Sequence, residues 1–392
     1  MNSTELCADI GYMSINHVGE NLCGDHVERV DQDERTTVLV LADGLGSGVK
    51  ASILSTLTSK IISTMIAAGM KLVDAVETIA ATLPVCSVRG VAYSTFTIIR
   101  LSDGKKAEII QYDNPKVIML RGGENLELPT VMTEIGGKKI YRSEVELEEG
   151  DIFIAMSDGV EHAGVGLKYN FGWRRADIIE FMRSFTHVGF SAKTLTKILL
   201  DECNKLYDGR PGDDATVLTV RIRERMHVNL MIGPPSDPAK THSVMEEFFG
   251  TEGKHVVCGG TTSTLAAEYL GRPLIPDLHF YDPEIPPTAE IKGVDLVTEG
   301  VITINRVLEY AKNYIADNSS YEEWSQKRDG ASRIARILFE DATDVKFFVG
   351  RAVNPAHQNP NLPINFNIKM RLIEELSQCL EKMGKRVTLE YN

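Results

Sequence analysis

The segment VLVLADG, residues 38–44, decides the fold of the first half of this 392-residue chain. Its apolar residues lead directly into Asp43 and Gly44, which is typical of a buried β-strand that stops abruptly at a carboxylate. A second segment, IFIAMSDG at residues 152–159, has the same form and contains Asp158. A hairpin turn would explain either Asp-Gly pair alone. The occurrence of an apolar run before both Asp-Gly pairs favours a shared site. The residues alone leave both interpretations, turn and shared site, open.

Two further acidic points lie at Gly24-Asp25 and at Gly212-Asp213-Asp214. Carboxylates at strand ends can hold hard divalent cations such as Mg²⁺ or Mn²⁺, which prefer oxygen ligands. Two such ions can activate a water molecule for attack on phosphorus. The acidic points are far apart in the sequence, so the site exists only if the fold gathers them. The pattern therefore predicts metal-dependent phosphoryl hydrolysis.

Composition and charge limit the class of protein. Hydrophobic residues make up 43% of the chain and charged residues 25%, as in a soluble globular protein. The net charge of −13 argues against nucleic acid or an anionic membrane as the main partner. The six cysteines form no Cys-x-x-Cys pair, and no apolar run approaches the length of a membrane span. No signal peptide is evident, and we expect a cytoplasmic protein.

The sequence pattern of residues 1–224 predicts an α+β domain with antiparallel sheets. β-Branched and apolar runs predict strands at 36–42, 92–101, 107–112, 116–121, 152–156 and 215–223. Apolar periodicity predicts helices at 52–68, 72–83 and 191–207. The triplet Ser102-Asp103-Gly104 indicates a hairpin between two of these strands.

Residues 228–392 follow a different pattern, which starts after a short charged segment at 221–225. Strands and helices alternate, which predicts an α/β domain with a mainly parallel, Rossmann-like sheet. The expected strands are 228–232, 255–257, 294–297, 345–349 and 386–390. The expected helices are 239–249, 263–270, 302–315 and 367–383, and a Pro-rich insert at 273–287 interrupts the alternation.

Four motifs in residues 9–223 resemble the SpoIIE-type branch of the metal-dependent (type-2C, PPM) serine/threonine protein phosphatases. They are GENLCGD at 19–25, LADGLGSG at 41–48, MSDGV at 156–160 and GDDATV at 212–217. The resemblance implies two antiparallel sheets flanked by helices, two Mn²⁺ or Mg²⁺ ions, and catalysis by the metal-binding aspartates. Its implied ligands are the carboxylates of Asp25, Asp43, Asp158 and Asp213, the carbonyl of Gly44 and, less directly, Asp214.

The same resemblance carries expectations about partners. It implies a role in bacterial signalling, a phosphoprotein substrate such as a STAS-type regulator, and a homodimer. It also makes the helix from Val49 to Ala68 a candidate regulatory switch. The apolar spacing of this helix alone predicts only a helix packed in the core. One departure is that eukaryotic relatives place a phosphate-binding arginine before the first acidic motif, where this chain offers only His17.

Three other interpretations of these motifs are weaker. Cys23 to Arg29 fits the Cys-x5-Arg pattern of thiol phosphatases, but the acids inside the loop would repel a thiolate and a phosphate. The glycine-rich stretch 43–48 lacks the Gly-Lys-Ser/Thr ending of a P-loop. His26 could act as a general acid, but a histidine beside a turn is more often simply solvated.

The second half offers one candidate ligand site. The stretch CGGTTS at 258–263 places two glycines and hydroxyl residues at a helix N-terminus, which can bind an anion. The predicted pocket residues are Gly259, Gly260, Thr261, Thr262 and Glu299. Arg351 after the next strand could add a guanidinium. The alternative is that these residues are helix caps and tight turns.

The sequence thus supports two hypotheses about function. The first is a metal-dependent phosphoserine/phosphothreonine phosphatase that uses a metal-activated water and is regulated by its C-terminal α/β domain. The second is a weakly active or inactive phosphatase-like signalling module that binds a small anionic ligand through that domain. The first predicts chelator-sensitive turnover, and the second predicts metal binding without turnover.

Overall fold

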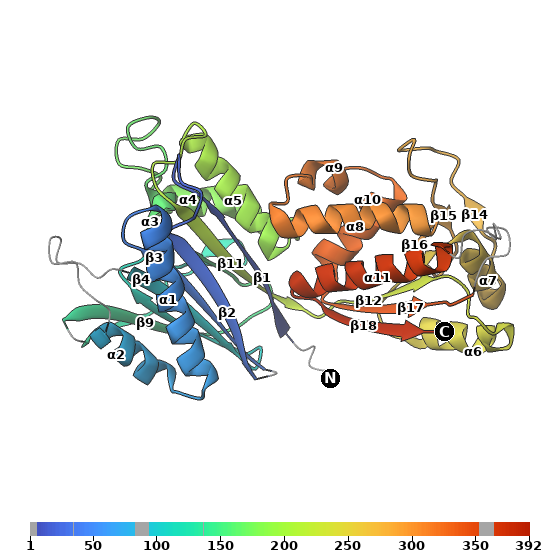
Figure 1. Cartoon of the computed structure of the whole chain (residues 1–392), viewed down its shortest axis with the longest axis horizontal. Coiled ribbons are helices and arrows are strands. Elements are labelled where there is room, and N and C mark those ends of the chain that lie inside the picture. Colours follow the sequence, from blue (N-terminus) through green and yellow to red (C-terminus); the bar gives the residue numbers. More distant parts are fainter. Residues whose placement is uncertain (1–5, 34, 83–93, 136, 353–363) are drawn as a thin grey trace. The chain divides into compact units, whose positions relative to one another are not determined.

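The computed structural model describes residues 6–33, 35–82, 94–135, 137–352 and 364–392. By its internal contacts the chain divides into two compact units, Met1–Glu224 and Arg225–Asn392 (Figure 1). Residues 83, 92 and 93 of the expected elements and Cys86 lie outside the described residues. No described helix is long and apolar enough to cross a membrane.

The first unit contains two antiparallel sheets, which confirms the predicted fold class. One sheet has the order β1 (Leu6–Ile15), β11 (Ala215–Glu224), β10 (Ile152–Met156), β6 (Ile118–Arg121) and β7 (Glu124–Asn125). The other has the order β2 (Asp25–Asp33), β3 (Thr36–Gly44), β4 (Ser94–Ser102), β5 (Lys106–Tyr112), β9 (Lys138–Glu146) and β8 (Thr130–Ile135).

Strand β3 is buried on both faces, and this explains its unbroken apolar sequence. Leu39 and Leu41 pack with Phe153 and Leu218 of the other sheet. The alternate residues, including Val40, pack beneath the helices on the outer face. Side chains of a strand point to opposite faces in turn, so a strand between two layers needs apolar residues at every position. Each fully buried leucine contributes about 1.5–3 kcal/mol.

Helices cover the outer faces of the two sheets (Figure 1). Helix α1 (Gly48–Ala67) and helix α2 (Leu72–Thr82) pack on the six-stranded sheet. Helices α4 (Arg175–Arg183) and α5 (Ala192–Leu206) pack on the five-stranded sheet, and the short helix α3 (Asp158–Glu161) follows β10. The order of layers is therefore helix, sheet, sheet, helix.

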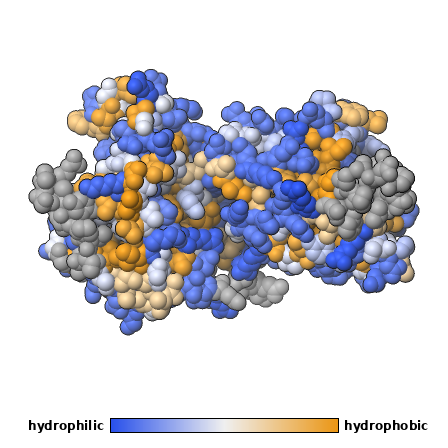
Figure 2. Space-filling view, viewed as in Figure 1, coloured by the Kyte–Doolittle hydropathy of each residue, from blue (hydrophilic) through white to orange (hydrophobic). Residues whose placement is uncertain are grey.

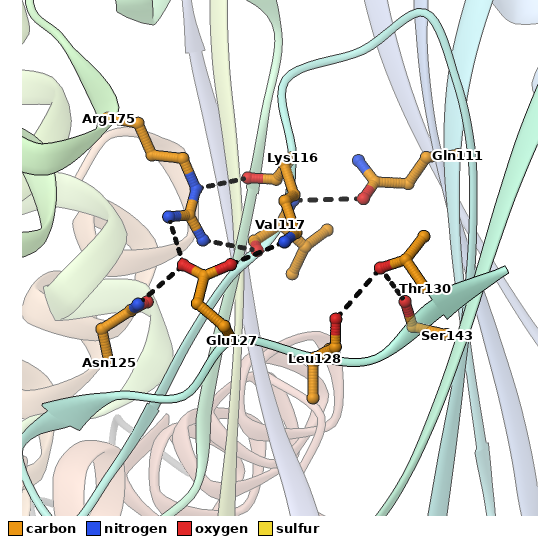
Figure 3. A network of polar contacts seen from close by, with 9 residues as sticks. All are labelled: Gln111, Lys116, Val117, Asn125, Glu127, Leu128, Thr130, Ser143 and Arg175. Atoms are coloured by element: carbon orange, nitrogen blue, oxygen red, sulfur yellow. Dashed lines mark hydrogen bonds and ion pairs between the residues drawn. The ribbon is translucent and has the colours of Figure 1, made fainter. Parts of the chain in front are cut away.

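Glu127 anchors the chain where it crosses from one sheet to the other (Figure 3). Its carboxylate accepts hydrogen bonds from Lys116 at 2.6 Å, Asn125 at 2.8 Å and Arg175 at 2.7 Å. These donors lower the pKa of Glu127 to about 2, with Lys116 the largest cause. Nearby, the side chain of Gln111 accepts the backbone N–H of Val117 at 3.2 Å. Polar contacts thus fix both crossings between the sheets, the first from β5 to β6 and the second from β7 to β8.

Helix α1 presents apolar side chains to solvent as well as to the sheet. Its buried face includes the small polar residues Ser55, Thr58, Ser59 and Ser63. Its outer face carries an exposed stripe with a spacing of four residues, formed by Val49, Ile53, Leu57 and Ile61, each 45–61% exposed. Figure 2 shows the apolar surface along this helix. We call these four residues the α1 stripe.

The second unit is built on one mixed, mostly parallel sheet, as predicted. The order is β14 (Ile275–Pro276), β15 (Ala289–Glu290), β16 (Leu296–Thr298), β13 (Lys254–Cys258), β12 (His227–Ile232), β17 (Asp344–Val349) and β18 (Arg386–Tyr391). The last five are parallel, and the two short strands β14, within the Pro-rich insert, and β15, just after it, add an antiparallel edge.

Helices cover both faces of this sheet. One core lies under α6 (Thr241–Gly250) and α7 (Gly260–Leu270). The other lies under α8 (Val301–Ala316), α10 (Gly330–Ala335) and α11 (Ile364–Lys382). The region between α8 and β17 holds α9 (Tyr321–Ser325), α10 and a π-helical turn at Arg336–Asp341, none of which the sequence pattern indicated.

Candidate metal centre

Asp25 and Asp43 lie opposite each other on neighbouring strands. Asp25 is the first residue of β2 and pairs in register with Asp43 near the end of β3. Antiparallel partners on one face have their Cβ atoms roughly 4.5–5.5 Å apart. Asp25 is buried, with only 6% of its surface exposed, whereas Asp43 is partly buried. Two carboxylates therefore share one edge of the six-stranded sheet.

Ser157 links this edge to the other sheet. Its hydroxyl donates a hydrogen bond to Asp25 Oδ2 at 2.7 Å and accepts the backbone N–H of Thr216 at 2.8 Å. Ser157 follows β10, and Thr216 lies in β11, so one buried hydroxyl joins three strands. The contact brings the residues after β10 and before β11 toward Asp25.

Asp214 holds the loop that precedes β2. Its Oδ1 accepts the backbone N–H of His17 and its Oδ2 that of Gly24, each at 2.9 Å. Asp214 is 3% exposed. Both oxygens of this carboxylate are thus engaged by the protein backbone. Asp213 is only partly buried, and among the described residues only its Oδ1 accepts a backbone N–H, that of Asp214 at 2.9 Å.

The glycines of the two Asp-Gly pairs allow close backbone contacts. A Cβ at Gly44 would lie 2.1 Å from the carbonyl oxygen of Ala51 in α1. A Cβ at Gly159 would lie 2.1 Å from the carbonyl oxygen of Asp214. Any side chain at either position would displace the neighbouring backbone. Each glycine therefore lets a second segment approach the carboxylate that precedes it.

Asp158 and Asp213 form a second acidic group together with His162. One ligand atom from each of the three lies within 4.8 Å of the others, a spacing that suits one metal ion. Asp158 and His162 are more than half exposed. Sequence reasoning missed His162, although its position four residues after Asp158 places both on one face of a helical turn. The site thus extends from Asp25, which is buried, to an exposed rim formed by Asp158, Asp213 and His162.

The carboxylates destabilise one another's charged forms. Burial, followed by the charges of Asp25, Asp158 and Asp213, raises the pKa of Asp43 to about 9. Burial is also the main cause that raises the pKa of Asp25 to about 7 and that of Asp213 above its ordinary value. Divalent cations would relieve this repulsion and have the oxygen ligands they prefer. The residues present therefore fit a cation site.

The structure also bears on the rival interpretations of the first motif. Burial, reinforced by Asp25 and Asp214, raises the pKa of the Cys23 thiol to about 12, which opposes formation of a nucleophilic thiolate. The imidazole of His26 contacts Glu28 at 3.2 Å. Because neighbouring residues of a strand point to opposite faces, His26 points away from the face that carries Asp25.

The residues predicted to form a pocket in the second unit lie at two helix starts. Gly259 has a φ of 109° and precedes α7, which begins at Gly260. The hydroxyl of Thr262 is buried and has no hydrogen-bond partner among the described residues. Glu299 precedes α8 and accepts the N–H of Ile302, in the first turn of that helix, at 3.1 Å. Its carboxylate is therefore committed to α8.

Paired antiparallel sheets with outer helices and carboxylates at one edge define the PP2C class of fold. Residues 33–223 match the model of the family described as Stage II sporulation protein E (SpoIIE). This part of the chain is a SpoIIE-type PP2C phosphatase domain, within a family of serine/threonine protein phosphatases. The match ends just before the second unit begins at Arg225.

The chain is also similar to a curated relative and to two solved structures. Stage II sporulation protein E of Bacillus subtilis (strain 168) is 23% identical over 209 residues, which cover 52% of this chain and 24% of the relative. The chain thus spans about a quarter of that relative's length. The phosphatase domain of SpoIIE from Bacillus subtilis gives a TM-score of 0.45 at 19% identity, covering 57% of this chain and 95% of that chain. The structure that adds a fragment of its regulatory domain gives 0.49 at 20%, covering 57% and 65%.

The raised pKa of Asp43 predicts a dependence of stability on pH. The folded protein holds a proton on Asp43 that the unfolded chain releases above its ordinary pKa of 3.8. The resulting stabilisation is present at low pH and is lost as the pH rises toward about 9. With a chelator present, the melting temperature of the wild type should therefore fall more between about pH 6 and pH 9 than that of Asp43→Asn. An equal fall in the melting temperature of both proteins over this pH range would contradict the raised pKa of Asp43.

His162 predicts a preference among metals. Imidazole suits transition metals, whereas Mg²⁺ prefers oxygen. Calorimetric titration should show that His162→Asn lowers the affinity for Mn²⁺ by about tenfold or more and the affinity for Mg²⁺ less. His26→Asn is the matched control and should leave both affinities unchanged. An equal loss of both metals, or none, would remove His162 from the ligand set.

Proposed function

We propose that the first unit hydrolyses phosphoserine or phosphothreonine on a protein partner in a reaction that requires two divalent cations, Mn²⁺ or Mg²⁺. The observation that carries this proposal is the meeting of four carboxylates from two sheets at one edge of the domain. The family of serine/threonine protein phosphatases to which residues 33–223 belong supports the same reaction.

The chain's own residues divide into an inner and an outer group. Asp25 and Asp43 would hold cations from the buried side, and the hydroxyl of Ser157 keeps the Asp25 carboxylate in place. Asp158, Asp213 and His162 would hold cations at the exposed rim, where a phosphorylated side chain can enter. When bound, the cations would supply an activated water molecule and positive charge for the phosphoryl group.

The charge of the protein makes those cations necessary for substrate binding. The chain carries a net charge of −13, and the site itself is acidic. A phosphate monoester would be repelled by this cluster unless metal ions reversed the local charge. The absence of an arginine before the first acidic motif adds to this requirement.

Replacement of Asp43 tests the proposed reaction. Asp43→Ala should lower Mn²⁺-dependent hydrolysis of an aryl phosphate and of a phosphoserine peptide by more than about 100-fold, because loss of a second-shell partner alone costs 10–100-fold. Asp201→Ala, at an exposed aspartate of α5, is the control and should retain wild-type rates. Unchanged turnover in Asp43→Ala would reject the proposed site. Metal binding without turnover in the wild type would favour a phosphatase-like binding module.

We also propose that the α1 stripe is covered by a second copy of the chain. Four large apolar side chains at a spacing of four residues form one continuous exposed row, the pattern of a helix that packs against another helix. The backbone of Ala51 in the same helix packs against Gly44, beside the candidate metal ligand Asp43. Contact along the stripe could therefore reach the site through α1, in line with a regulatory switch.

Sedimentation tests this dimer. The wild type should sediment as a dimer at micromolar concentration, and Leu57→Glu should sediment as a monomer because the substitution places a charge in the apolar contact. Val131→Glu, at an exposed apolar residue of β8, is the control and should remain dimeric. A monomeric wild type, or a dimeric Leu57→Glu, would show that the stripe has another role.

A further inference from the structure

The sheet of the second unit reverses its strand order between β12 and β17. From one edge of the parallel part, the strands run β16, β13, β12, β17 and β18. The chain therefore proceeds outward in one direction from β12 to β16 and in the other from β17 to β18. In open parallel sheets, ligands bind beyond the carboxyl ends of the strands at this point of reversal. Here it lies between the loops that follow Ile232 and Val349.

The two loops at this point are in close contact. A Cβ at Gly350 would lie 2.1 Å from the carbonyl oxygen of Pro234 and 2.2 Å from that of Gly233. Gly233 itself has a φ of +81°, and a Cβ there would lie 2.5 Å from the ammonium nitrogen of Lys369. Glycine at both positions therefore brings the two backbones and the tip of this lysine together.

Lys369 is a buried cation without an anionic partner among the described residues. It lies in α11, is 9% exposed and donates a hydrogen bond to the carbonyl oxygen of Gly350. No described carboxylate lies within ion-pair distance of its ammonium group. Burial lowers the pKa of Lys369. Burying an unpaired charge is costly, so such a group calls for an explanation.

A second buried lysine shows what a purely structural arrangement looks like in the same unit. Lys385 is 8% exposed and donates to the carbonyl oxygens of Phe339 at 2.8 Å and Ala342 at 2.7 Å. These carbonyls end the π-helical turn, and Lys385 has further interactions. Lys369 has one carbonyl partner and therefore retains N–H groups for a ligand.

Other groups beside the two loops are also donors. Arg351 follows Gly350 and places its guanidinium 5.0 Å from the ring centre of Tyr391. Its backbone N–H donates to the main-chain oxygen of Asn392 at 2.7 Å, and that of Ser236 donates to the same oxygen at 3.3 Å. The side-chain amide nitrogen of Asn392 is buried without a partner in the described structure. An ammonium that contacts the loop after β17, a guanidinium in that loop and an amide donor that follows β18 thus lie at the same end of the sheet.

We propose that this point of the second unit binds the phosphoryl group of a small molecule through Lys369, Arg351 and the side-chain amide of Asn392. Two cationic groups match the double charge of a phosphate monoester, and the guanidinium suits two phosphate oxygens at once. Pro234 and Pro235 have no N–H, so side chains rather than a glycine-rich loop provide the donors. The site differs from the predicted one at Gly259 to Thr262 and does not depend on the proposed phosphatase reaction.

Calorimetry on the full chain tests this site. Titrations with inorganic phosphate and with ADP are made in the presence of a chelator, so that no metal in the first unit can bind the anion. The wild type should bind at least one of the two. Lys369→Met should weaken that binding by about 10- to 100-fold, the loss expected for one charge-assisted hydrogen bond. Lys382→Met, an exposed lysine of the same helix, should bind like the wild type.

The two probes and a second variant define the outcomes. Binding of ADP alone assigns the site to nucleoside phosphates, and binding of both probes with similar affinity assigns it to the phosphate group itself. Arg351→Gln changes an exposed residue and keeps the test valid if Lys369→Met does not fold. It should also weaken binding by about tenfold or more. Failure of the wild type to bind either probe, or wild-type affinity in Lys369→Met and Arg351→Gln, would overturn the proposal.

Discussion

The hydrogen bond from Ser157 to Asp25 is the contact on which the acidic site depends. The candidate ligands come from two sheets, and packing of apolar side chains between sheets does not by itself fix the position of their ends. The Ser157 hydroxyl does so, because it donates to Asp25 in one sheet while it accepts the N–H of Thr216 in the other. Asp214 completes the arrangement by holding the backbone at His17 and Gly24. The contacts of Asp25 with Ser157 and of Asp214 with Gly24 are buried, where hydrogen bonds to a charged group are strongest.

These contacts work against the repulsion among the carboxylates. Asp25 and Asp43 face each other at the paired ends of β2 and β3, where burial removes most of their contact with water, so their charges are poorly solvated and the pKa values of both rise. A fold selected for stability alone would place neutral residues here. Rigid strands, the Ser157 bridge and close glycine contacts keep the carboxylates together in spite of this cost. The result would be a site that is prepared for cations before they bind, at the expense of the stability of the metal-free domain.

The sequence predicted the parts of this structure that rest on local patterns. β3 and β10 were evident because strands buried on both faces have unbroken apolar runs, and β12, β13 and β16 of the second unit were evident for the same reason. β1, β2, β8 and β9 were missed because partly exposed strands alternate weakly and contain charged residues. The roles of Asp214 and Lys369 could not be predicted, since their partners lie far away in the chain or depend on how loops pack. His162 could have been found from its spacing relative to Asp158.

The first unit places negative side chains at its strand ends, and the second unit places positive ones there. The net charge of the chain therefore affects the two units differently. An excess of 13 negative charges produces a potential that favours cations near the acidic edge of the first unit. The same potential disfavours an anion at the second unit, and salt screens it only beyond roughly 8 Å. An anion site in such a protein needs local positive charge in a poorly solvated place, where attraction over a short distance outweighs the long-range field. The buried Lys369 at the reversal of strand order would meet this requirement, and Arg351 would add charge at its exposed side.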